Sequence, residues 1–219
     1  MNRKSTTLLG ASALALGSLL APSAHAVQIS EVLYDAVGTD NGTVFVELWG
    51  APGTSLDGWH IEGVNGADGA IGPSLALTGQ IGAGGFFVVA DSDAGTTQVA
   101  NADLLANFDF QNGPDSVVLR DALGNVLDAL GYGVFGVAEI FAGEGSPAPD
   151  GLAGQSLARV FANRDTNDNA ADFALLDTPT PGSGPLLVPE PGAAAPLALF
   201  SCALGLARRF RSRVPSAVR

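Results

Sequence analysis

The sequence predicts an all-β domain, a β-sandwich or a barrel, between an N-terminal signal peptide helix and a C-terminal transmembrane helix. Short runs of β-branched and aromatic residues recur between turns rich in glycine, aspartate and asparagine. Strong helix signals are scarce between the two ends of the chain. The only cysteine, Cys202, lies near the C-terminus, so the body has no disulfide; a chain of about 155 residues can bury a sufficient core without one.

The body is expected to contain eight short strands in a single domain over residues 27–182. In order, they are residues 29–34, 44–49, 59–62, 75–77, 86–90, 116–120, 126–130 and 157–161. Residues 86–90 are continuously apolar, which favours a central strand covered on both faces. Residues 121–125 contain a glycine between two such runs and predict a hairpin. We expect a helix at residues 97–106 and a long surface loop at residues 131–154.

Residues 1–26 are typical of a cleavable export signal. Arg3 and Lys4 are followed by a mostly apolar run at residues 8–20, which is too short for a standard membrane span. Ala24 and Ala26 then place small side chains at the two positions that signal peptidase reads. The alternative is an uncleaved N-terminal membrane helix. We expect cleavage, and a mature chain that begins at Val27.

The C-terminal region combines three features in a fixed order. A linker at residues 183–191 ends with Pro189, Glu190 and Pro191, and residues 193–207 are mostly apolar. Four arginines follow closely: Arg208, Arg209, Arg211 and Arg213. As a helix the apolar run would measure about 23 Å, against a hydrocarbon core of about 30 Å. We expect residues 192–219 to be a transmembrane segment with a basic, cytoplasmic tail.

This arrangement resembles the PEP-CTERM sorting signal. The resemblance implies recognition by an exosortase of a Gram-negative bacterium and removal of the tail near residues 189–191. Before this removal the tail would hold the protein transiently in the inner membrane. After it, the protein would reach the cell surface or the extracellular matrix. The alternative is an ordinary single-span membrane protein.

Charge separates the body from both ends. Residues 27–191 hold three arginines, no lysine and all 22 acidic residues, a net charge of −19. A surface of this sign repels nucleic acid, so no nucleic-acid partner is expected. It keeps an exported protein soluble, and it would also attract divalent cations.

Three segments of the body resemble the opening of the lamin tail domain. They are Glu31-Val32-Leu33-Tyr34-Asp35, Val44-Phe45-Val46-Glu47-Leu48 and Leu56-Asp57-Gly58-Trp59. Residues 154–159, 165–173 and 178–182 are similar to the end pattern of bacterial members. The resemblance covers residues 27–182 and implies an immunoglobulin-like sandwich. It implies little chemistry, because such domains occur in nuclear lamins and in secreted bacterial proteins.

Residues 165–169 are the candidate metal site, with calcium as the cation they would hold. Asp165, Asn167 and Asp168 place oxygen ligands close together, but Ala170 and Leu176 stand where an EF-hand loop needs glycine and a bidentate acid. A looser calcium site and a polar turn both remain open.

The other polar residues of the body give no catalytic set. Two loops carry further acids, Asp35, Asp40 and Asn41 in one, and Asp91 and Asp93 in the other. His60 is the only histidine after the signal, and we expect it to be exposed.

The sequence therefore predicts a non-catalytic, secreted or surface module with a structural or adhesive role in the extracellular matrix. Signal peptidase and exosortase would be its processing enzymes, and an extracellular polymer or a surface protein its partner. A calcium-dependent binding module is the alternative, and a metal-assisted hydrolase that uses loop carboxylates is a weaker one. No cofactor other than calcium is expected.

Overall fold

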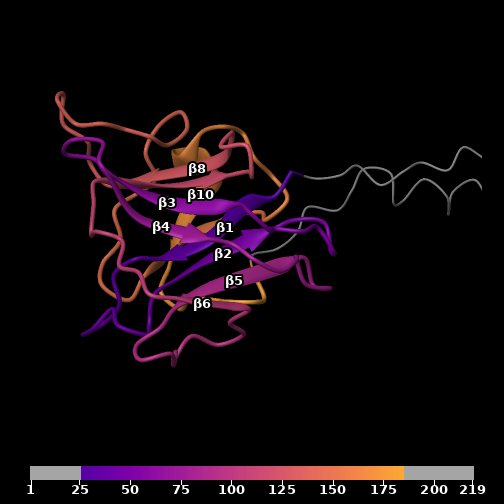
Figure 1. Cartoon of the computed structure of the whole chain (residues 1–219). Helices are drawn as coiled ribbons and strands as arrows, with labels where there is room; N and C mark the ends of the chain where they lie inside the picture. The colour runs from indigo at the N-terminus through magenta and orange to yellow at the C-terminus, as the bar shows by residue number, and fades with distance from the viewer. Residues whose placement is uncertain (1–25, 185–219) are drawn as a thin grey trace, which may run out of the picture.

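The computed structural model describes residues 26–184, which form a sandwich of two β-sheets (Figure 1). The predicted transmembrane segment and the predicted signal peptide, apart from Ala26, lie outside these residues. Within residues 26–184, no helix combines the length and the apolar character needed to cross a bilayer. The all-β fold class is confirmed for the body.

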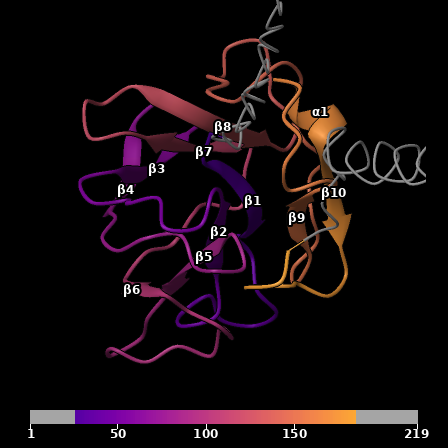
Figure 2. The ribbon, with the colours of Figure 1, turned by 90° about the vertical axis from the view of Figure 1, so that its right-hand side faces the viewer.

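The first sheet contains six strands in the order β10-β9-β1-β2-β5-β6. Their bounds are β1 Gln28–Leu33, β2 Phe45–Trp49, β5 Phe86–Asp91, β6 Leu104–Ala106, β9 Ser156–Arg159 and β10 Phe173–Leu176. Neighbouring strands are antiparallel, except that β6 runs parallel to β5. Strands β9 and β10 and the short helix α1 (Asn169–Asp172) lie together on one side of the molecule, next to β1 (Figure 2).

The second sheet contains four antiparallel strands in the order β4-β3-β7-β8. They are β3 His60–Asn65, β4 Ile71–Ala76, β7 Asp115–Arg120 and β8 Val126–Tyr132. The predicted hairpin between β7 and β8 is confirmed. Asp121 holds its turn, since its carboxylate accepts hydrogen bonds from the amides of Leu123 and Asn125.

Alternating side chains of both sheets fill the space between them. Val46 and Leu48 of β2 face Ile61 of β3 and Leu119 of β7 in one fully buried cluster. A side chain of this size contributes about 1.5–3 kcal/mol when it is buried completely. The period-2 pattern in the sequence therefore reflects which side of each strand faces the core.

The helix expected at residues 97–106 is wrong. Asn101 has a positive φ of 56°, which ends any helical run, and residues 104–106 form the edge strand β6. Asp103 draws this segment onto β5: its amide donates to the Val88 carbonyl, and its carboxylate accepts from the Val88 amide. Two tertiary hydrogen bonds thus override a weak local preference.

Candidate functional site

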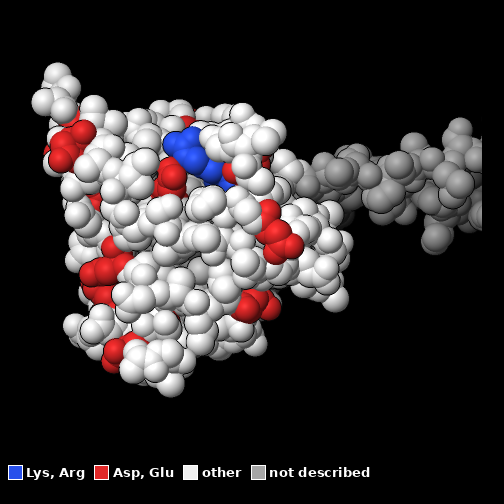
Figure 3. Space-filling model, viewed as in Figure 1, with Lys and Arg blue, Asp and Glu red and all other residues white. Residues whose placement is uncertain are grey.

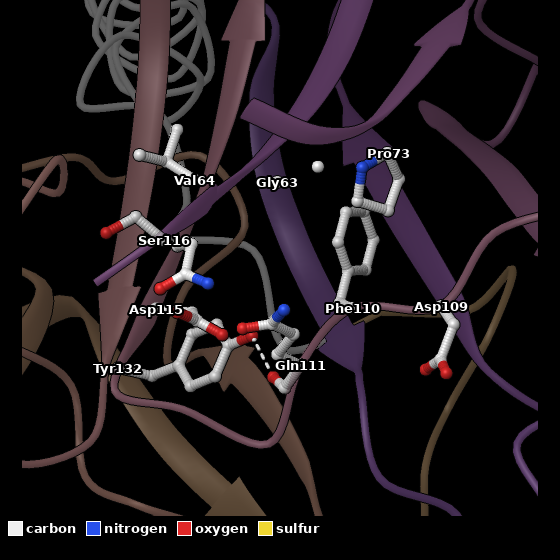
Figure 4. Close-up of a pocket in the computed structure, with 11 residues that line it drawn as sticks. Gly63, Val64, Pro73, Asp109, Phe110, Gln111, Asp115, Ser116 and Tyr132 are labelled. Carbon is white, nitrogen blue, oxygen red and sulfur yellow. Dashed lines mark hydrogen bonds between the residues drawn. The ribbon is translucent and has the colours of Figure 1, made fainter. Parts of the chain in front are cut away.

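A small polar pocket opens where β3, β4 and β7 meet the chain before β7 (Figure 4). Its lining residues are Gly63, Val64, Asn65, Gly72, Pro73, Asp109, Phe110, Gln111, Asp115, Ser116 and Tyr132. Its volume is about 50 Å³, which suits a few water molecules. Pockets for small-molecule ligands are several times larger.

The polar groups of this pocket are largely committed to the fold. The Tyr132 hydroxyl donates to the Gln111 carbonyl oxygen at 2.8 Å (Figure 4). The Tyr132 ring also stacks on Tyr34, with 4.2 Å between the ring centroids. Asp115 accepts a hydrogen bond from the Gly66 amide at 2.6 Å, and burial raises the pKa of its carboxyl. The pocket therefore has the character of a hydrated junction between loops.

A fully buried arginine, Arg159, is the main charged centre of the molecule. From β9 in the first sheet it reaches Asp128 of β8 in the second, with Nη2 at 2.8 Å and 3.1 Å from the two carboxylate oxygens. Nη1 lies 3.1 Å from Asp172, and Nε donates to the Ile29 carbonyl at 3.0 Å. The guanidinium also lies 4.6 Å from the centre of the Phe173 ring. Because Asp128 and Arg159 belong to different sheets, this charged pair, in which Nη2 contacts both carboxylate oxygens, joins the two layers.

The three predicted metal ligands lie in the turn beside Arg159, and each makes contacts within the protein. Asp165 is 3.5 Å from Arg159 Nη1 and accepts from the Asn167 amide at 2.9 Å. Asp168 is the N-cap of α1, since its carboxylate accepts from the Ala170 amide at 3.2 Å. Asn167 adopts a positive φ of 55°, as asparagine often does in turns.

Only Asp165 of these three belongs to a group of acidic side chains that converge. Its partners are Asp128 and Glu144, and the oxygens of all three lie within 4.8 Å of one another; we call this group the acidic cluster. Glu144 Oε2 is buried without a hydrogen-bond partner. Burial, and then the charges of Asp128 and Asp165, raise the pKa of Glu144 to about 7. Arg159 already lies against two members of the cluster, so a positive charge is present there.

The loop acids act as acceptors that hold their own loops. Asp91 is buried and accepts from the amides of Gly42 and Phe108 at 2.6 Å and 2.8 Å. Asp40 accepts from the Ala36 amide at 2.7 Å. His60 is half-buried on β3, so its predicted exposure is only partial. On the face seen in Figure 3, acidic side chains form several separate patches and basic side chains a single small one.

The family model of the lamin tail domain matches residues 21–134, just over half of the chain. The chain belongs to the lamin tail domain family. A comparison with curated proteins found no match. The resemblance seen in the opening segments is thereby confirmed at the level of the family.

The first sheet continues with strands that lie beyond the matched residues. Strand β9 pairs with β1, with Glu31 opposite Ala158 and Val32 opposite Leu157, and β10 pairs with β9. The first sheet would lose one flank without them. The described fold therefore includes two strands, β9 and β10, that lie C-terminal to the matched residues.

Two glutamates of the lamin tail pattern, Glu31 and Glu47, are fully buried and lie opposite each other on β1 and β2. A β-bulge between Ile29 and Glu31 adds one residue to β1, and this extra residue, Ser30, donates its hydroxyl to Glu47 at 2.6 Å. Trp59, the third element of the pattern, packs against the core while partly exposed. The sequence showed these glutamates as part of the lamin tail pattern, but it did not predict that they are buried. Their neighbours in the sequence do not indicate which distant segment covers them.

Proposed function

We propose that this lamin tail domain is a non-catalytic, exported module with a structural or adhesive role at the cell surface or in the extracellular matrix. Signal peptidase would release the chain after Ala26, and an exosortase would act near Pro189, Glu190 and Pro191. The partner would be an extracellular polymer or another surface protein, and nucleic acid would be excluded by the negative charge.

The observation that carries the proposal is that buried and loop carboxylates are engaged in hydrogen bonds and ion pairs within the protein. Asp40, Asp91 and Asp115 accept hydrogen bonds from backbone amides, and Asp128 and Asp172 surround Arg159. Such side chains hold loops and layers in place, as a binding scaffold requires. A catalytic constellation would instead aim an activated group at an open cavity.

Mass spectrometry of the exported protein tests the delivery route. In a deletion strain complemented with the chain, we expect a mature N-terminus at Val27 and loss of every residue after about 191. The same strain, compared with the deletion, should regain normal matrix and surface adhesion.

Two outcomes would refute this function. Recovery of the full 219-residue chain from the cytosol would remove the export route. Normal matrix and adhesion in the deletion strain, together with loss of a hydrolytic activity, would favour the hydrolase.

Calcium binding is the second candidate, because the acidic cluster offers three carboxylates. Calcium takes six to eight oxygen ligands, and Arg159 already neutralises part of the cluster. We therefore expect calorimetric titration with millimolar calcium to give no heat and no change in melting temperature. Heat that disappears in Glu144→Gln would instead establish the calcium-dependent module.

A further inference from the structure

The last seven described residues, 178–184, form a segment that we call the strap. It follows β10 and returns to the face of the first sheet that points away from the core, beside β1 and β2 (Figure 2). Glu31 and Glu47 point to this outer face, since neighbouring residues of a strand alternate sides and Val46 and Leu48 face the core.

Glu31 holds the first half of the strap. Its Oε1 accepts from the Thr180 amide at 2.9 Å, and its Oε2 accepts from the Thr180 hydroxyl at 2.6 Å. The Ser156 hydroxyl of β9 donates to Oε1 at 2.6 Å. One strap residue therefore makes two hydrogen bonds to a single buried carboxylate.

Glu47 holds the second half. Its Oε2 accepts from the Gly182 amide at 2.6 Å, while Ser30 occupies its Oε1. Between these two contacts, the side-chain amide of Asn101 donates to the Pro181 carbonyl at 2.8 Å. The strap is thus bound by side chains from β1, β2 and the segment before β6.

The strap fits this face closely. Gly182 has a φ of 81°, and a Cβ atom there would overlap Asn101. A Cβ atom at Gly184 would overlap the Phe86 ring in the same way. The glycines are required for the backbone to approach the sheet, so the face is shaped for a Thr-Pro-Gly turn.

We propose that Glu31 and Glu47 form a binding site for a Thr-Pro-Gly turn, occupied by this chain's own strap, and that opening of the site sets how far the segment after residue 184 reaches from the folded body. The second part rests on the function proposed above, because it concerns access to residues 189–191. The first part depends on the buried contacts alone.

Because Glu47 is buried, the stability of the fold around the site depends on pH. Burial raises the pKa of Glu47 to about 7, helped by the charges of Glu31 and Asp103 and opposed by the hydrogen bonds from Ser30 and Gly182. The unfolded value is 4.5, so the closed site binds more protons than the unfolded chain between pH 4.5 and pH 7. This contribution of Glu47 to the stability of the whole fold is complete below pH 4.5 and is lost as the pH rises through 7.

Opening changes the reach of the processing motif. Pro189 follows Gly184 by five residues, which span at most about 17 Å when fully extended. When the strap is released, Pro189 follows Asp177 by twelve residues, which span about 40 Å. A closed site therefore keeps the motif near the folded body and slows its entry into a membrane-embedded enzyme.

Hydrogen exchange of the full chain tests the site. Replacement of Thr180 by valine removes one hydrogen bond to a carboxylate with little change of shape. We expect the protection factors of the strap amides to fall about tenfold, because such a bond contributes about 1.5 kcal/mol. In Glu47→Gln, which keeps an acceptor and cannot ionise, the free energy of unfolding should no longer fall through this residue between pH 4.5 and pH 7.

Thr178→Val is the matched control, since Thr178 is an exposed threonine of the same strap. It should leave the protection unchanged. Equal hydrogen-exchange protection of the strap amides in the wild type and in Thr180→Val would contradict the proposed binding site. A free energy of unfolding that falls between pH 4.5 and pH 7 as steeply in Glu47→Gln as in the wild type would contradict the role of Glu47 in the pH dependence.

The rate of C-terminal trimming, followed by pulse–chase in cells, tests the effect on reach. Thr180→Val should be trimmed faster than the wild type, and Thr178→Val at the wild-type rate. If Thr180→Val is trimmed at the wild-type rate although its strap amides are less protected, the proposed effect of the strap on the reach of the processing motif is wrong. The binding site itself would still be established. Absence of trimming in every chain would refute the proposed sorting route, while the exchange result still decides the site.

Discussion

Replacement of Arg159 by methionine is expected to lower the free energy of unfolding by about 3–5 kcal/mol. The guanidinium is fully buried and neutralises Asp128 and Asp172, two carboxylates that are themselves buried. Methionine fills a similar volume and removes the positive charge, which leaves both acids without their counter-charge. Thermal unfolding should show a melting temperature lower by roughly 10 °C.

Arg120→Met provides the control. Arg120 lies 2.7 Å from Glu62, and its side chain is 30% exposed, so this pair should contribute less than about 1 kcal/mol. A loss in Arg159→Met equal to that in Arg120→Met would contradict the importance of the buried pair.

The cause of the Arg159 effect can be separated from loss of packing by its pH dependence. Without the arginine, the two buried aspartates should bind protons more readily in the folded state than in the unfolded chain. The folded variant should therefore be most stable below about pH 4 and lose stability as the pH rises. If the free energy of unfolding of Arg159→Met is lower than that of the wild type by the same amount from pH 4 to pH 8, the loss comes from packing alone.

Several strands were predictable because each carries its own local signal. Residues 44–49 alternate between core-facing and outward-facing side chains, and residues 86–90 are apolar throughout, and both appear as β2 and β5 within one residue of the predicted bounds. The turn at Asp121 was predictable for the same reason, since its hydrogen bonds are local.

The parts that the sequence did not predict depend on partners far away in the chain. Strand β6 forms because Asp103 bonds to Val88, and helix α1 is only four residues long. The buried pair of Arg159 and Asp128 joins residues 31 positions apart, and Thr180 reaches Glu31 across 149 positions. A single sequence carries no local sign of such contacts, although an arginine in a strand that is otherwise apolar or small was a clue to a buried partner.

The sequence indicated the acids of residues 165–169 as metal ligands, but it did not indicate the acids that lie next to them in space. Asp165 lies near Glu144 and Asp128, which come from a loop and a strand that the pattern does not connect. Asp168 serves as a helix cap, so its carboxylate accepts a backbone hydrogen bond. In any cluster of Asp and Asn residues, such hydrogen bonds to the backbone compete with metal binding for the side-chain oxygens.

Replacement of Asn169 by alanine is expected to lower the free energy of unfolding by about 3 kcal/mol or more. Asn169 is fully buried beside β8, the last strand of the second sheet. Its Nδ2 donates to the Ala129 carbonyl at 2.8 Å, and its Oδ1 accepts from the amides of Gly131 and Glu144 at 2.8 Å and 2.9 Å. Alanine would leave three backbone groups without partners, and each unsatisfied buried group costs about 1–3 kcal/mol. Chemical denaturation measures the loss.

Asn125→Ala is the matched control, because Asn125 is exposed and its side-chain amide donates to the Asp121 carboxylate at 2.8 Å. It should change the stability by less than about 1 kcal/mol. Because Asn169 occupies backbone groups at a sheet edge, its loss should also let β8 pair with another chain, and size-exclusion chromatography should show self-association in Asn169→Ala alone. A monomeric Asn169→Ala variant as stable as Asn125→Ala would mean that the edge is protected by the loop at Ala148, whose amide donates to the Gly131 carbonyl.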